Sequence, residues 1–170
     1  MKRIIILTAL FLILLPVTQT KAKTKIPEPT FEETVEAMVR EHRIMLDRLI
    51  AAWEYRQEEI NLLAEVIYHE NWHTDKEHLA AYYTGAVVMN RVNSKAWPDT
   101  VKKVLYQKGQ YSTTKLFFTK EIPAECYEMA RDIYRNGTPD VPENVIFQSM
   151  QKGLGRGHWK VINGEYFAYG

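Results

Sequence analysis

Cysteine is almost absent from this chain, since Cys126 is the single thiol among 170 residues. No disulfide can form within the chain, so the fold must rest on its apolar core. An excess of one charge sign is also lacking, because 22 basic residues oppose 21 acidic residues. A nearly neutral chain has no electrostatic footprint for nucleic acid, and we expect no nucleic-acid partner. Cys126 continues a helical apolar pattern with Ile122, Met129 and Ile133, which places it in the core.

Long hydrophobic runs are confined to the N-terminus. Lys2 and Arg3 precede an apolar run over residues 4–17, and small residues around Ala22 suit a cleavage point. The run is shorter than the roughly 20 residues of a membrane span, so residues 1–22 are predicted to be a secretory signal peptide. We therefore expect a secreted or cell-envelope protein that contacts the membrane only if this segment stays uncleaved. Removing its three positive charges changes the formal net charge from +1 to −2.

A linker and a long helix are predicted next. Residues 23–30 hold two prolines, and Thr30 with Glu33 forms a capping box that starts an amphipathic helix over 31–59. The apolar side chains of this helix recur at spacings of three, four or seven residues: Val35, Met38, Met45, Leu49 and Trp53. We expect this stripe to lie on the chain's own domain rather than in a coiled coil. No Gly or Pro interrupts the pattern up to Glu70, so one long helix and two abutting helices are both allowed.

The remaining segment, residues 60–170, is predicted to be one catalytic domain. Helical patterns cover 60–70, 79–92, a short stretch near 101–105, and the residues from Pro123 to the Asn136-Gly137 pair. Strand composition follows at 145–147, and apolar pairs flank Asn163-Gly164, a strong hairpin signal. The predicted fold is therefore α+β and mostly helical, with a small C-terminal antiparallel β element.

One short string allows a metal site. His69-Glu70-Asn71-Trp72-His73 has the H-E-x-x-H spacing, which on a helix puts two imidazoles one turn apart with a glutamate beside them. Such a site would indicate a zinc metallopeptidase or a zinc-dependent N-acetylmuramoyl-L-alanine amidase. A third ligand is needed, but the positions three and six residues beyond His73 hold Lys76 and Leu79. A glutamate from a later helix could serve instead, and Glu121 and Glu125 remain open for this, although neither has a surrounding motif. His73 also falls where the helix is expected to end, so we favour no metal or other cofactor and keep zinc chemistry as the alternative.

The same glutamate supports a second interpretation. Glu70 is a lone carboxylate at the end of an apolar helix, with Ile67, Tyr68 and Trp72 close by in sequence. Burial beside apolar groups raises a carboxyl pKa, as an acid working near neutral pH requires. Both interpretations make Glu70 catalytic, and they differ in the metal, in the bond that is broken and in the role of the two histidines.

Five segments carry a family resemblance because they occur in one order along the chain. They are the apolar helix 62–70 ending in Glu70, the Asn-Arg-Val segment 87–94, the turn and helix of 97–107, the Gly-Gln-aromatic-Ser turn 109–112, and the strand segments 145–148 and 166–167. Together they resemble the SleB-type cell-wall hydrolases, also called spore-cortex-lytic enzymes, over residues 60–170. The family's spore enzymes usually carry an N-terminal peptidoglycan-binding domain, whereas here we expect only the helix over 31–59 before the catalytic domain. The turn 71–75 is bulkier than the family's turn.

The resemblance implies a lysozyme-related helical domain that cuts the glycan strands of peptidoglycan. It implies a lytic transglycosylase, which cleaves between N-acetylmuramic acid and N-acetylglucosamine and leaves a 1,6-anhydro end. Glu70 would act first as acid and then as base. A hydrolytic glycosidase needs a second carboxylate across the bond, and Asp75 and Asp99 are the two that folding could bring there. A catalytically silent envelope-binding module is the remaining alternative, which the retained Glu70 disfavours.

Six further residues are candidates for contact with the glycan: Gln110, Tyr111, Ser112, Gln148, Trp159 and Tyr169. The two glutamines are polar groups in turn or apolar segments, suited to hydrogen bond N-acetyl and hydroxyl groups. The three aromatic side chains are able to stack on sugar faces, with ordinary packing as the competing interpretation. The sequence sets no oligomeric state.

Overall fold

A computed structural model describes residues 28–170, so the predicted signal peptide and most of the predicted linker lie outside the described residues. The chain forms two compact units, and the boundary between them lies between His42 and Arg43. The second unit, Arg43–Gly170, contains every element after the first helix. Within residues 28–170 no helix is both long enough and apolar enough to span a membrane.

The first helix, α1 (Phe31–Asn71), begins at the predicted capping box. The Glu33 amide donates to Thr30 Oγ1 at 3.2 Å, and the Thr30 amide donates to Glu33 Oε2 at 2.7 Å. This reciprocal pair satisfies two N–H groups that a helix start leaves without partners. Of the two arrangements that the sequence allowed, one continuous helix is formed.

Within the second unit the apolar stripe of α1 is not packed on the domain, and for these residues the prediction is wrong. In the second unit Met45, Leu49 and Trp53 are 51%, 59% and 60% exposed. Burial begins only at Glu59 and Ile60 and continues to Asn71. Helical periodicity shows that one face is apolar but not which surface covers it, so the stripe alone could not distinguish the two cases.

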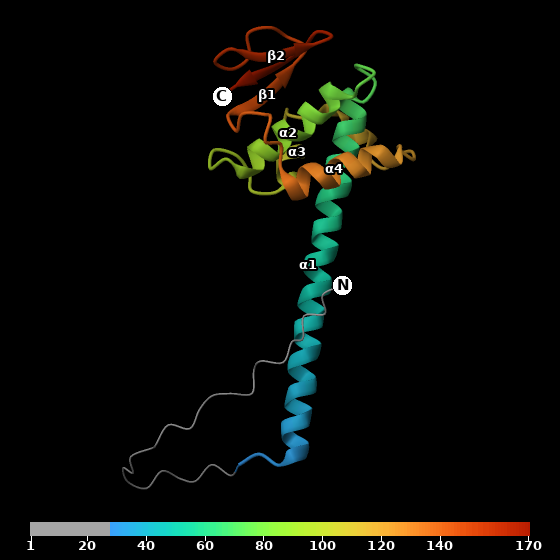
Figure 1. Ribbon diagram of the computed structural model, residues 1–170, viewed down its shortest axis with the longest axis vertical. Helices are drawn as coiled ribbons and strands as arrows, with labels where there is room; N and C mark the ends of the chain where they lie inside the picture. Colours follow the sequence, from blue (N-terminus) through green and yellow to red (C-terminus); the bar gives the residue numbers. More distant parts are fainter. Residues whose placement is uncertain (1–27) are drawn as a thin grey trace, which may run out of the picture. The chain divides into compact units, whose positions relative to one another are not determined.

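Seven shorter elements follow α1, in an order that confirms the mostly helical α+β prediction (Figure 1). They are α2 (Leu79–Asn93), α3 (Val101–Leu105), the 3₁₀ helix η1 (Ser112–Leu116), α4 (Ala124–Asn136), and the strands β1 (Val145–Ser149), β2 (His158–Ile162) and β3 (Glu165–Tyr169). The strands form an antiparallel sheet in the order β1-β3-β2. Asn163 and Gly164 both have positive φ, as the predicted β2–β3 hairpin requires.

Helix α2 is the centre of the second unit, because it contacts α3, α4 and β1 (Figure 1). One apolar core joins it to the buried end of α1 and to α4, and a second core joins it to the sheet around Phe167. Gly85 permits the close approach in the first core. A Cβ at this position would lie 2.6 Å from Ile133 Cδ1 and 3.1 Å from Ile67 Cδ1. Cys126 is fully buried in the same core, as predicted.

A buried carboxylate attaches α1 to α3. Glu59 is 2% exposed and accepts backbone N–H groups from Val101 at 2.6 Å and from Lys102 at 3.2 Å. These are the first two residues of α3, whose amides have no partner within the helix. Thr100 caps the next amide, that of Lys103, at 3.1 Å. Glu59 thus fixes the short helix to the longest one.

Candidate active site

Glu70 lies one residue before the end of α1, at the wall of a cavity of about 390 Å³. Its Oε1 accepts a hydrogen bond from the Thr113 hydroxyl of η1. The cavity is lined from five parts of the chain: Glu70, Arg91, Gly109, Gln110, Tyr111, Phe147, Gln148, Ser149, Met150, Leu154 and Glu165. α1, α2, the turn before η1, and the sheet therefore meet around Glu70.

A buried arginine supports one side of this cavity. Arg91 Nε donates to the Ile146 carbonyl at 2.7 Å, and Nη1 donates to the Tyr111 hydroxyl at 3.3 Å. The guanidinium also lies 4.3 Å from the centre of the Trp97 ring. Burial lowers the pKa of Arg91, and burial raises the pKa of Tyr111 to about 12. Tyr111 thus presents an uncharged hydroxyl that is fixed by a cation.

A second carboxyl group shares the cavity, and it belongs to Glu165 at the start of β3. Glu165 is 6% exposed. Burial raises its pKa above the usual value, and the negative charge of Glu70 raises it further, while the Asn71 amide acts in the opposite direction. Like charges at one site favour keeping a proton on one of the two groups. Glu70 and Glu165 are thus electrostatically coupled within one cavity.

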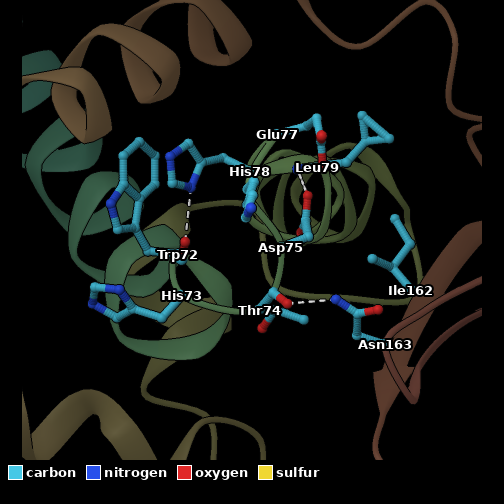
Figure 2. A pocket seen from close by; sticks show the side chains of 10 residues that line it. Trp72, His73, Thr74, Asp75, Glu77, His78, Leu79, Ile162 and Asn163 are labelled. Carbon is cyan, nitrogen blue, oxygen red and sulfur yellow. Dashed lines mark hydrogen bonds between the residues drawn. The ribbon is translucent and has the colours of Figure 1, made fainter.

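The two carboxyl groups are held together by the loop that follows α1. Asn163, at the β2–β3 hairpin, donates to the Thr74 carbonyl at 2.6 Å (Figure 2). Glu165 is two residues beyond Asn163, and Thr74 is four residues beyond Glu70. Asn71 extends the connection, since it donates to Thr84 Oγ1 at 2.8 Å and accepts from Thr74 Oγ1 at 2.8 Å. The hairpin and the end of α1 are therefore linked through Asn163, Thr74 and Asn71.

Further contacts hold this loop, and Figure 2 shows the side chains that make them. Trp72 stacks on His78 with ring centres 3.7 Å apart, and His78 Nδ1 lies 2.7 Å from the Trp72 carbonyl. Asp75 accepts the Leu79 amide at 2.7 Å and the Ala80 amide at 3.0 Å. A larger hollow of about 880 Å³ lies over this loop, but neither Glu70 nor Glu165 lines it. The smaller cavity is the candidate active site because it holds both carboxyl groups.

Neither of the two carboxylates that folding could have brought beside Glu70 lines the cavity. Asp75 caps the start of α2 through two backbone amides. Asp99 is exposed and pairs with Lys103 at 2.8 Å. Glu165 was not predicted as a site residue, although its position two residues before Phe167 in a predicted strand segment indicated that the two side chains share a face. Side chains at alternate positions of a strand share a face, so Glu165 lies on the same face of β3 as the fully buried Phe167.

Three of the six predicted glycan-contacting residues line the cavity: Gln110, Tyr111 and Gln148. Gln148 Oε1 is buried and accepts no hydrogen bond from the described part of the chain. The structure does not bring the other three into this lining. Ser112 is exposed at the start of η1, Trp159 packs 4.9 Å from the Tyr83 ring, and Tyr169 packs against the second core. Thr113, the partner of Glu70, was not predicted.

The two histidines of the H-E-x-x-H string lie in different surroundings. His69 is in α1, with Nε2 3.3 Å from the buried Glu65 carboxylate and its ring stacked on Phe117. His73 comes after the helix end, as expected, and is exposed. Across residues 28–170, no three His, Cys, Asp or Glu side chains are grouped in a way that suits a metal ion.

A model of the cell wall hydrolase family matches residues 77–161, which is half of the chain. The chain belongs to the SleB-type cell wall hydrolases. The resemblance seen in the sequence is thereby confirmed, and the protein is an enzyme that degrades peptidoglycan. Comparisons with curated proteins and with solved structures gave no match.

The residues that match the family model form part of the wall of the candidate active site. The match includes Arg91, Gln110, Tyr111 and Gln148 on the cavity wall. It begins after Glu70 and ends before Glu165. The family match thus covers the scaffold of the cavity, and the two carboxyl groups are assigned to it by the structure.

Proposed function

We propose that this protein is a secreted enzyme that cuts the glycan strand of peptidoglycan between N-acetylmuramic acid and N-acetylglucosamine, as a lytic transglycosylase. The observation that carries the proposal is the position of Glu70. Its carboxyl group lies at the wall of a cavity, oriented by the Thr113 hydroxyl and surrounded by amide, hydroxyl and aromatic groups. Such a mixture of an acid and convergent polar groups in a hollow suits a sugar substrate.

The reaction requires one proton donor at the scissile bond. Protonated Glu70 donates to the glycosidic oxygen, the C1–O bond breaks, and N-acetylglucosamine leaves with that proton as a hydroxyl. The C6 hydroxyl oxygen of the same N-acetylmuramic acid then bonds to C1 and gives its proton to the Glu70 carboxylate. The product is a 1,6-anhydro end, Glu70 is regenerated and no water is consumed.

The groups around Glu70 supply binding contacts for this reaction. Gln148 Oε1 is a buried acceptor, which the N–H of an N-acetyl group would satisfy. Arg91 holds the Tyr111 hydroxyl in the cavity wall, where it can donate to a sugar oxygen. Gln110 adds a second amide from the turn before η1. These contacts come from two separate elements, the turn before η1 and strand β1, and so would fix the sugar in one orientation.

The test is mass spectrometry of the muropeptides released from purified peptidoglycan, with and without EDTA. We expect new 1,6-anhydro ends whose yield EDTA does not change, and none from Glu70→Gln at unchanged folding by circular dichroism. Free stem peptides that disappear with EDTA would instead support the zinc amidase. Undiminished turnover by Glu70→Gln would remove Glu70 from the mechanism.

A further inference from the structure

Glu165 has no task in a reaction that needs one carboxyl group, although it faces the same cavity as Glu70. A charged side chain that is 6% exposed is costly to retain unless a partner or a function compensates for it. Glu165 appears in no ion pair among residues 28–170. A role in packing alone would be served better by an uncharged side chain.

We propose that Glu165 is a second catalytic residue, which activates water in this cavity, so that the enzyme also releases hydrolysed glycan ends. This inference rests on the proposed function, because it uses the same bond and the same first step. Glycoside hydrolysis requires two carboxyl groups that flank the scissile bond, one as acid and one as base or nucleophile. The cavity contains two, Glu70 on α1 and Glu165 on β3, contributed by different elements.

The hydrolytic branch diverges after the C1–O bond has broken. Glu70 has given its proton to the departing N-acetylglucosamine and is ionised. A water oxygen bonds to C1 of N-acetylmuramic acid, and the released proton goes to the Glu165 carboxylate. One proton has thus moved from Glu70 to Glu165, one water has been added across the bond, and exchange with solvent restores the starting state.

The surroundings of Glu165 suit this role. The groups that face it are the Glu70 carboxyl group, the Asn71 amide, the Tyr111 hydroxyl and, through Tyr111, the Arg91 guanidinium. Burial raises the pKa of Glu165, and the negative charge that Glu70 carries once it has donated its proton raises it further, so Glu165 accepts a proton from water most readily at that step. The position is also fixed, because the hydrogen bond between Asn163 and Thr74 ties the hairpin to the loop after Glu70.

The measurement is the ratio of hydrolysed to anhydro ends. Purified peptidoglycan is digested, reduced with borohydride and analysed by mass spectrometry, which separates muramitol ends from 1,6-anhydro ends. A digest with Glu70→Gln gives the background of existing ends. The variants are Glu165→Gln, Glu165→Asp and, as a matched control, Glu77→Gln, whose carboxyl group is exposed and lies outside the cavity.

We expect the wild-type protein to release both kinds of end, with the hydrolysed share rising with pH as Glu165 ionises. Loss of a general base typically costs about 100-fold or more, so Glu165→Gln should lower the hydrolysed share at least about tenfold and remove its pH dependence. The anhydro yield of each variant is measured alongside, because the hydrolysed share of the products, and not their total yield, is the readout. Glu165→Asp should keep part of the hydrolysis, and Glu77→Gln should match wild type in both products.

Three results would overturn the inference while leaving the proposed function intact. They are a wild-type digest with anhydro ends alone, an unchanged product ratio in Glu165→Gln, and loss of both products by a folded Glu165→Gln. If Glu165→Gln does not fold, the wild-type protein alone tests the inference. A ratio of hydrolysed to anhydro ends that stays constant with pH would contradict a role for Glu165 as a base. A wild-type digest with neither kind of new end would instead contradict the proposed function.

Discussion

Asn163 and Thr74 join two parts of the chain that each carry one carboxyl group of the candidate active site, through a hydrogen bond of 2.6 Å from Asn163 Nδ2 to the Thr74 carbonyl. Glycine tolerates the positive φ of residue 163, so Asn163→Gly removes this bond without straining the hairpin. A neutral hydrogen bond contributes about 1 kcal/mol, and we expect the melting temperature to fall by a few degrees. The rate of glycan cleavage should fall more than this stability change explains. Equal activity at a temperature well below melting would show that the contact does not align the site.

The hydroxyl of Thr113 orients the carboxyl group of Glu70. Thr113→Val keeps the shape of the side chain and removes the donor. A hydrogen bond to a charged group contributes about 1.5–3 kcal/mol, so kcat should fall about tenfold or more. Thr119→Val is the control, because the Thr119 hydroxyl donates to the Leu116 carbonyl at the exposed end of the same segment. Similar kcat values for the two variants would exclude an orienting role for Thr113.

The buried cap that Glu59 provides for α3 should be measurable in stability. Glu59→Gln leaves two amides of α3 facing one acceptor and an NH₂ group, and we expect it to lower the free energy of unfolding by about 1–3 kcal/mol. Glu58→Gln is the matched neighbour, since Glu58 is exposed and forms a surface ion pair with Lys102. Such pairs contribute about 0–1 kcal/mol, so this control should stay close to wild type in urea denaturation. Equal effects of the two variants would contradict the capping role.

Gly85 should reject even a methyl group. Gly85→Ala gains about 1 kcal/mol of helix propensity, but its Cβ would lie 2.6 Å from Ile133 Cδ1 in a tightly packed core. Overpacking costs about 1–3 kcal/mol, so a net loss of stability is expected. Ile133→Val removes the atom in conflict, and the double variant should be more stable than the sum of the two single changes predicts. Additive effects in a double-mutant cycle would locate the strain elsewhere.

Glu165 should make stability depend on pH. Its pKa is raised in the folded protein, so the folded state binds the proton more strongly than the unfolded chain does. The associated stability is complete below the unfolded pKa and is lost as pH rises through the raised folded value. Glu165→Gln carries no titrating group and should therefore gain stability relative to wild type between acidic and neutral pH. Urea denaturation of both proteins at several pH values checks this, and a constant difference would contradict it.

The parts of the fold that local sequence determines were predicted well. The capping box at Thr30, the hairpin at Asn163-Gly164 and the end of α1 before His73 each depend on a few adjacent residues, and all three are observed. Glu70 was placed by its helix and by the family resemblance. The fold class could also be predicted, because helices and strands are each recognised from local patterns and all the predicted helices precede the strands.

The parts that depend on distant contacts were not predicted. Glu165 meets Glu70 only after the hairpin docks on the loop that follows α1, and nothing near either residue encodes that docking. Asp75 and Asp99 could not be excluded from the site by local pattern. The structure shows that Asp75 binds the Leu79 amide and that Asp99 pairs with Lys103. The exposed stripe of α1 is the third case, since its periodicity does not identify a covering surface.

The strand order has a consequence for how the active site is assembled. β3 is the middle strand although it comes last of the three in sequence, so β1 and β2 have no hydrogen-bonded neighbour in the sheet until β3 has been synthesised. The strands that carry Gln148 and Glu165 are therefore joined to each other directly, by the pairing of β1 with β3. Pairings between distant segments form slowly. The first helix thus carries Glu70 alone, and the wall of the cavity opposite it is complete only when β3 has paired with both of its neighbours.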